Sequence, residues 1–187
     1  MNHQRSPQPL DVGEVTEQVI LVDKEDNELG YALKNEPHHH PTKLHRAFSL
    51  FVLNSKDQLL LQKRSSKKER WPGFWSNTCC SHPRPNEPVQ LAGERRLEEE
   101  LGFNCKMDFL FKFEYSAKYD DEWGENELDH VFVGYYDGPV KHDPNEIEET
   151  KWINLDELRE DMEKNPGKYT PWLRICFKRF LYNIGKT

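Results

Sequence analysis

Short apolar runs separated by polar turns indicate that much of this chain forms β-strands. Residues 19–22 are continuously apolar and end at Asp23, as expected for a buried strand. The runs 47–53 and 58–62 flank a polar turn at 54–57, and this pattern predicts a hairpin. Further strands are predicted at 109–115, at 130–136 and around 151–153.

Three segments have the spacing of amphipathic helices. In the first, Asn86 is suited to the N-cap, Pro88 to the first turn and Gly102 to a left-handed C-cap. Its apolar positions recur one turn apart and should face the sheet: Val89, Gly93, Leu97 and Leu101. The second helix should run from Asp156 to about Lys164 and the third from about Pro171 to Tyr182. The inner face of the third is predicted to carry Trp172, Ile175, Cys176 and Phe180.

This alternation of strands and helices predicts one domain of mixed α/β (α+β) class. Residues 1–16 are polar and contain Pro7 and Pro9, so we expect a flexible N-terminal arm, with the domain over 17–187. A chain of 187 residues is long enough for one substantial core and short for two.

Charge and composition narrow the function classes. The net charge of −7 argues against nucleic-acid binding as the main role, although local basic clusters can still bind an anionic substrate. The sequence contains no apolar run of 18 residues and no signal core after its first residues, so we expect a cytoplasmic protein without a membrane anchor. The four cysteines are then expected to be free thiols.

Histidines and a pair of glutamates are candidates for metal ligands. Glu125 and Glu127 should point to one face of a strand, because side chains alternate with a period of two. Imidazoles together with carboxylates suit a divalent transition metal. The run His38-His39-His40 would more often be solvated when taken alone, so a metal site requires His45, His82 and the glutamates to converge.

The thiol of Cys80 lies two residues before His82, and a carboxylate-rich helix follows directly. The spacing Ser81, Glu87, then Arg95-Arg96-Leu97-Glu98-Glu99-Glu100-Leu101-Gly102-Phe103 resembles the Nudix box. Ser81 replaces its usual glycine, and Arg96 replaces a glutamate that helps to bind catalytic Mg²⁺ in the hydrolases. A cation at Arg96 weakens the interpretation as a metal-dependent hydrolase and offers a contact for phosphate.

More widely, residues 17 to 182 resemble the type I isopentenyl-diphosphate isomerases, a family with the Nudix fold. The likeness rests on Lys34 and His38, on Leu44-His45-Arg46-Ala47-Phe48-Ser49 and on Trp71-Pro72-Gly73-Phe74-Trp75-Ser76-Asn77. It continues through Cys80-Ser81-His82-Pro83, Arg96, Glu100, Tyr115, Glu125-Asn126-Glu127 and Thr170-Pro171-Trp172.

The resemblance implies a Nudix-like mixed sheet flanked by helices and an isomerase of isoprenoid biosynthesis. Such an enzyme converts isopentenyl diphosphate to dimethylallyl diphosphate through a tertiary carbocation. It implies that Cys80 and Glu127 transfer protons on opposite faces of the substrate. It also implies that Tyr115 orients Glu127 or relays protons to it, and that Trp172 stabilises the cation. The gapless spacing of the likeness favours His38 over its two neighbours.

The same resemblance implies the ligands and the substrate contacts. His38, His45, His82, Glu125 and Glu127 would bind Zn²⁺ or Mn²⁺, and Glu100 would join a separate Mg²⁺ to the diphosphate. Lys34, Arg64, Lys68 and Arg96 would bind the diphosphate, and the protein would act as a monomer. Because Cys80 lies near metal ligands and cations, we expect a lowered thiol pKa.

Two other functions are compatible with parts of the pattern. A Nudix hydrolase of nucleoside or prenyl diphosphates would share the helix, but Arg96 argues against it. A non-catalytic module with a structural zinc site would share the histidines, but such sites are usually four-coordinate and rich in cysteine.

Overall fold

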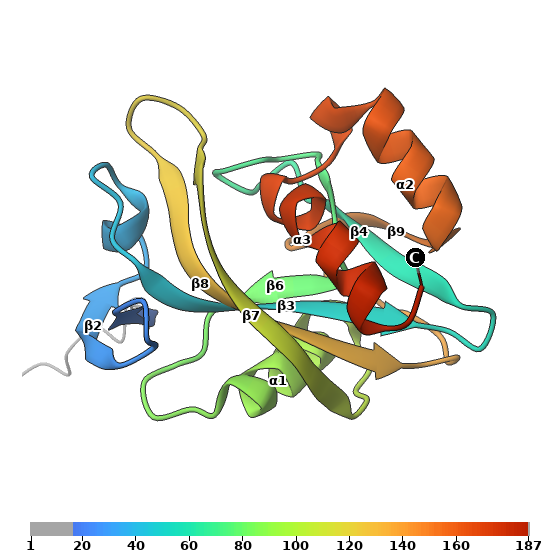
Figure 1. Ribbon diagram of the computed structural model, residues 1–187, viewed down its shortest axis with the longest axis horizontal. Helices are drawn as coiled ribbons and strands as arrows, with labels where there is room; N and C mark the ends of the chain where they lie inside the picture. The colour runs from blue at the N-terminus through green and yellow to red at the C-terminus, as the bar shows by residue number, and fades with distance from the viewer. Residues whose placement is uncertain (1–16, 187) are drawn as a thin grey trace, which may run out of the picture.

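The computed structural model describes residues 17–186 and contains a nine-stranded sheet with helices on both faces (Figure 1). The predicted arm over 1–16 lies outside the described residues. The first strands are β1 (Gln18–Val22), β2 (Glu28–Leu33), β3 (His45–Leu53), β4 (Gln58–Arg64), β5 (Trp75–Ser76) and β6 (Cys79–Ser81). The remaining elements are α1 (Val89–Leu101), β7 (Met107–Lys118), β8 (Gly124–Tyr135), β9 (Ile147–Asn154), α2 (Leu155–Lys164) and α3 (Pro171–Asn183). Two short 3₁₀ turns, η1 (Glu36–His38) and η2 (Pro166–Lys168), complete the order.

Strand β3 lies at the centre of the fold, where it pairs in parallel with β8. Both faces of β3 are covered, which explains its continuous apolar run. Phe48, Leu50 and Val52 join the core beneath α1, whereas Phe51 and Leu53 join the core beneath α2 and α3. Figure 1 shows α1 on one side of the sheet and α2 and α3 on the other.

The predicted hairpin between β3 and β4 is only partly correct. Both strands flank the turn as expected, but they pair with each other only at Leu53 and Leu59. The segment 75–81 lies between them, with β5 paired to β4 and β6 paired to β3. The hydroxyl of Thr78 accepts from the Val52 N–H at 2.9 Å and donates to the Leu60 carbonyl at 2.7 Å. This segment therefore supplies hydrogen-bond partners for backbone groups of the two strands that it separates. The insertion carries Cys80 into the sheet.

Helix α1 begins later than predicted and ends where predicted. Its N-cap is Pro88, and Asn86 is instead a turn residue with φ of 63°. Gly102 forms the left-handed C-cap with φ of 70°, and a Cβ there would lie 2.7 Å from the Lys141 carbonyl oxygen. The predicted inner residues Gly93, Leu97 and Leu101 are buried, and Val89 packs against the same core.

Helix α3 covers the other face of the sheet with a wider stripe than predicted. Trp172, Cys176 and Phe180 are buried as expected, and Leu173 and Phe177 lie beside them. The prediction for Ile175 was wrong, since its side chain is 51% exposed. The buried stripe is centred between the 172 and 173 rows, which turns position 175 toward solvent.

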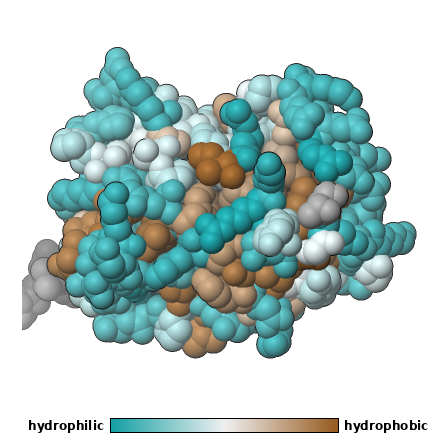
Figure 2. All heavy atoms as spheres, viewed as in Figure 1, coloured by the Kyte–Doolittle hydropathy of each residue, from teal (hydrophilic) through white to brown (hydrophobic). Residues whose placement is uncertain are grey.

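The face of the molecule that carries α2 and α3 is mainly hydrophilic, with hydrophobic residues visible between hydrophilic ones (Figure 2). Among the described helices, none is both long and apolar enough to cross a membrane.

Candidate active site

Strand pairing places three of the predicted site residues in one row across the sheet. Glu127 on β8 lies opposite Tyr115 on β7 and opposite His45 on β3. The hydroxyl of Tyr115 donates to Glu127 Oε2 at 2.5 Å. The row therefore combines a phenol, a carboxylate and an imidazole from three strands that are distant in sequence.

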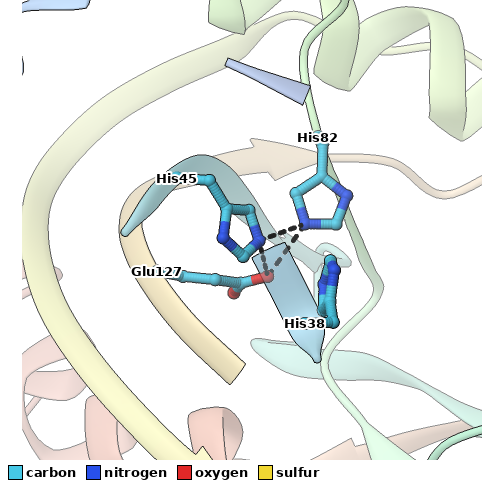
Figure 3. Close-up of side chains that lie close together, drawn as sticks. All are labelled: His38, His45, His82 and Glu127. Atoms are coloured by element: carbon cyan, nitrogen blue, oxygen red, sulfur yellow. Dashed lines mark hydrogen bonds and ion pairs between the residues drawn. The ribbon is translucent and has the colours of Figure 1, made fainter. Parts of the chain in front are cut away.

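Four of the predicted metal ligands converge around this row (Figure 3). His38 comes from η1 and His82 from the segment after β6, and their rings point toward His45 and Glu127. One ligand atom from each of the four residues lies within 4.8 Å of the others. His82 Nε2 is 2.9 Å from Glu127 Oε1 and 3.2 Å from His45 Nε2, and His45 Nε2 is 3.5 Å from Glu127 Oε1.

These separations fit a single divalent cation. Metal–nitrogen bonds of about 2.0–2.1 Å, at angles between octahedral and tetrahedral, place adjacent ligand atoms about 2.8–3.4 Å apart. The Nδ1 atoms of His38 and His45 lie 2.6 Å and 2.9 Å from the Lys34 and Lys43 carbonyl oxygens. Nδ1 donates to the carbonyl in each case, so the Nε2 lone pair remains for a cation. Three imidazoles and a carboxylate suit a transition metal better than Mg²⁺.

The remaining ligand candidates lie at the edge of the cluster or outside it. Glu125 Oε2 lies 3.0 Å from His38 Nε2, which places Glu125 at the edge of the cluster. His39 stacks edge-on against Trp123 at 5.2 Å between ring centroids, and neither His39 nor His40 belongs to the cluster. Glu100 lies apart from the cluster, is 3% exposed, and accepts a hydrogen bond from Arg96.

Burial and neighbouring groups set the charges of the cluster. Burial lowers the pKa of His38 and that of His82 to about 3, so both rings are neutral at neutral pH. Burial, with Glu127 nearby, raises the pKa of Glu125 to about 8. Burial would also raise the pKa of Glu127, but hydrogen bonds from His45 and His82 outweigh it and hold that pKa well below its usual range. Two adjacent carboxyl groups thus have very different proton affinities.

A cavity of about 360 Å³ adjoins the cluster. Its walls include Cys80, Tyr115, Glu127 and Trp172, all predicted to take part in catalysis. The indole N–H of Trp172 donates to Ser76 Oγ at 2.9 Å, and this contact fixes the ring against the cavity. The same cavity therefore joins a thiol, a carboxylate and an aromatic face.

The expectation of a lowered thiol pKa at Cys80 was wrong. Burial, together with the nearby carboxyl groups of Glu100, Glu127 and Asp129, raises the pKa of Cys80 to about 12 despite Arg64. Proximity in sequence to histidines and cations did not reveal the carboxyl groups that lie near the thiol. Cys80 is consequently a neutral thiol at physiological pH.

The four predicted diphosphate-binding cations also line this cavity: Lys34, Arg64, Lys68 and Arg96. Arg64 donates to the carbonyl oxygens of Trp71 at 3.1 Å and Arg70 at 2.9 Å, and it lies over the Trp172 ring at 5.3 Å. Lys34 is paired with Glu17 at 2.5 Å. The cavity thus has one end rich in fixed cations, as an anionic group requires.

Sequence reasoning missed two charged residues at the site. Arg70 lines the cavity, and its Nε lies 3.9 Å from Glu125 Oε1. Glu146 contacts both Lys68 and Arg96. Arg70 could have been proposed from the sequence, because it lies in the same basic loop as Lys67 and Lys68. Glu146 is distant from every motif, so no sequence pattern points to it.

Comparisons with known proteins show the family to which the chain belongs. The Nudix domain family model matches residues 43–173. Isopentenyl-diphosphate Delta-isomerase 1 from Aromatoleum aromaticum is 47% identical over 88% of this chain and 93% of its own length. Isopentenyl-diphosphate Delta-isomerase 1 from Photorhabdus laumondii is 44% identical over 89% of this chain and 96% of its own length.

Solved structures confirm the fold class. A crystal structure from Deinococcus radiodurans superposes with a TM-score of 0.72 at 20% identity, over 87% of this chain and 98% of that one. A MutT protein from Methanosarcina mazei superposes with a TM-score of 0.61 at 21% identity, over 73% of this chain and 92% of that one. From the family model and the curated relatives together, the chain belongs to the Nudix family and, within it, to the isopentenyl-diphosphate Delta-isomerases.

Proposed function

We propose that this isopentenyl-diphosphate Delta-isomerase moves the substrate double bond by proton transfers between Cys80, Glu127 and the five-carbon chain. The reaction converts isopentenyl diphosphate to dimethylallyl diphosphate. The curated relatives of this chain are named for this isomerisation. The main support for the residue assignment is the single cavity that Cys80, Glu127, Trp172 and four cations line together.

The diphosphate would bind at the cationic end of the cavity. Lys34, Arg64, Lys68 and Arg96 supply ammonium and guanidinium donors that replace its hydration shell. This end fixes the substrate so that its hydrocarbon part reaches toward Cys80 and Glu127. Correct placement is essential, because an alkene is a weak base and accepts a proton only from a closely held acid.

One group adds a proton to the terminal alkene carbon and leaves a tertiary carbocation on the neighbouring carbon. The other group then removes a proton from the adjacent methylene, and the double bond forms in its new position. The thiol form of Cys80 suits it to donate, and the carboxylate form of Glu127 suits it to accept. In the reverse reaction each group takes the opposite role.

Tyr115 and Trp172 would assist the charged stages. The Tyr115 hydroxyl, 2.5 Å from Glu127 Oε2, holds that carboxylate in place and can pass a proton to it. The Trp172 ring offers its negative face to the carbocation. Burial of the site keeps out water, which would capture the cation.

We assign the transition-metal site to His38, His45, His82, Glu125 and Glu127, with Zn²⁺ or Mn²⁺ as the ion. A divalent cation there would supply fixed positive charge that orients Glu127 and tunes its proton affinity. Glu100 would hold a separate Mg²⁺ that reaches the protein with the diphosphate. We further propose that the protein acts as a monomer in the cytoplasm.

The test is a deuterium-exchange assay on the native protein and on Cys80→Ala. In D₂O the native protein should form the allylic product and incorporate deuterium, whereas Cys80→Ala should lose at least about 10²-fold in rate. Release of phosphate without allylic product would favour a hydrolase instead. Unchanged exchange in a folded Cys80→Ala protein would overturn the role of the thiol.

A further inference from the structure

Glu146 is an acidic residue at the cationic end of the cavity, in the segment just before β9. Its Oε2 accepts a hydrogen bond from Lys68 Nζ, and its Oε1 lies 3.4 Å from Arg96 Nη2. Lys68 comes from the loop between β4 and β5, and Arg96 comes from α1. One carboxylate thus joins two cations that reach the cavity from separate elements.

The Glu146 carboxylate contacts these cations without lining the cavity. Lys68 and Arg96 themselves line it. An anion in the cavity and the Glu146 carboxylate would therefore bind the same two side chains. The Glu146 side chain is only 26% exposed, so solvent screens these contacts less than it screens a surface ion pair.

The backbone around Glu146 is anchored independently of its carboxylate. Its carbonyl oxygen accepts from the Ser65 N–H at 3.0 Å, and the Pro144 carbonyl accepts from Ser65 Oγ at 3.2 Å. Lys67 Nζ donates to Asn145 Oδ1 at 2.6 Å. These bonds hold the 143–146 segment against the loop that carries Lys68, so the backbone that carries the Glu146 carboxylate is fixed in place.

The cations at this end of the cavity repel one another when no anion separates them. Burial lowers the pKa of Lys68, and the charges of Arg64, Lys34 and Arg96 add to this effect against that of Glu100. The Glu146 carboxylate contacts both Lys68 and Arg96, so it offsets this repulsion and restricts the orientations of both side chains.

We propose that Glu146 is a positioning residue for the diphosphate, which holds Lys68 and Arg96 ready for the substrate. This inference rests on the proposed function and deepens it. Loss of the carboxylate should weaken binding of the diphosphate much more than it slows the proton transfers, because Cys80 and Glu127 do not contact Glu146.

The experiment measures kcat and KM for Glu146→Gln, Glu146→Asp and a control, Glu148→Gln. Glu148 lies two residues further on, in β9, and pairs with Lys63 at 2.8 Å, with a side chain that is 46% exposed. Binding of inorganic diphosphate at constant Mg²⁺ is measured by calorimetry for each variant in a Cys80→Ala background. Thermal unfolding of each variant reports whether the fold is intact.

We expect Glu146→Gln to raise KM and the Kd of diphosphate about tenfold, equivalent to about 1.4 kcal/mol, with kcat within about threefold of native. Glu146→Asp should recover part of the loss, and Glu148→Gln should match the native protein. Unchanged KM and Kd in Glu146→Gln, or an equal loss in Glu148→Gln, would overturn the inference. A native protein that forms no allylic product would instead overturn the proposed function.

Discussion

At the scale of single residues, environment matters more than residue type at this site. Glu125 and Glu127 are two positions apart on β8, yet the pKa of Glu125 is raised to about 8 and that of Glu127 is strongly lowered. The difference arises because the imidazoles of His45 and His82 contact the Glu127 carboxylate and favour its ionised form. Burial and the nearby charge of Glu127 instead favour the protonated form of Glu125. Cys79 and Cys80 likewise enter opposite cores, although they are adjacent.

The first prediction concerns the aromatic face of Trp172. Replacement by Leu should lower kcat about thirtyfold, because a desolvated cation–π contact contributes about 2 kcal/mol. Trp172→Phe should retain more activity, since it keeps an aromatic face while it loses the hydrogen bond to Ser76. Steady-state kinetics of both variants test the prediction. Equal loss in the Phe and Leu variants would show that the ring acts only through packing.

At the scale of elements, the hairpin of β1 and β2 is joined to the sheet by few backbone contacts. β1 pairs with β3 only at Leu21 and His45. Asp26, in the hairpin turn, adds side-chain contacts to three strands: Arg46 Nε at 2.8 Å, Lys112 Nζ at 3.0 Å and His130 Nε2 at 2.9 Å. This carboxylate therefore compensates for the sparse pairing of the hairpin.

The second prediction follows from the charge of Asp26. Burial would raise its pKa, but Arg46, Lys112 and His130 outweigh burial and lower it. The ionised form is thus favoured by folding, so its contribution is present above the unfolded pKa of about 3.9 and is lost as the pH falls through the lower folded value.

Asp26→Asn should lower the free energy of unfolding by about 1 kcal/mol at pH 7, after allowance for solvent screening, and by much less near pH 2. Asparagine tolerates the positive φ of 75° at this position, so the change isolates the charge. Urea unfolding at both pH values is the measurement, with the exposed Asp108→Asn as control. A deficit of equal size at both pH values would contradict the electrostatic account.

At the scale of the whole molecule, the histidine and glutamate cluster joins the central strand pair β3 and β8 to two connecting segments. Its members come from η1, β3, β8 and the segment after β6. A cation bound to all of them would cross-link the sheet to both connecting segments, so metal binding and stability should be coupled.

The third prediction is therefore that removal of the metal lowers both activity and the thermal unfolding temperature. Addition of Zn²⁺ or Mn²⁺ should restore both, whereas Mg²⁺ alone should not, because imidazole ligands favour transition metals. The measurements are metal content, unfolding temperature and allylic product formation on the same samples. Full activity in protein shown to be free of transition metal would contradict the assignment.

From the sequence alone we predicted most of the strands and helices, the fold class and a set of candidate site residues. Local patterns set the bounds of β1, α2 and the end of α1, because periodicity and capping depend on neighbouring residues. The wide match of motifs identified His38, Cys80 and Glu127 before any contact was known. It also favoured His38 over His39 and His40, and the structure places His38 in the cluster.

Strand pairing, burial and charge depend on contacts between segments that are far apart along the chain. The insertion of 75–81 between β3 and β4 depends on hydrogen bonds between Thr78 and two residues, Leu60 and Val52, that are 18 and 26 positions away, which no local pattern encodes. The raised pKa of Cys80 and the contacts of Glu146 arise in the same way, because the groups involved come together only in the folded protein. The pKa of a group and the strength of an ion pair depend on distances through space, and distances along the chain do not determine these.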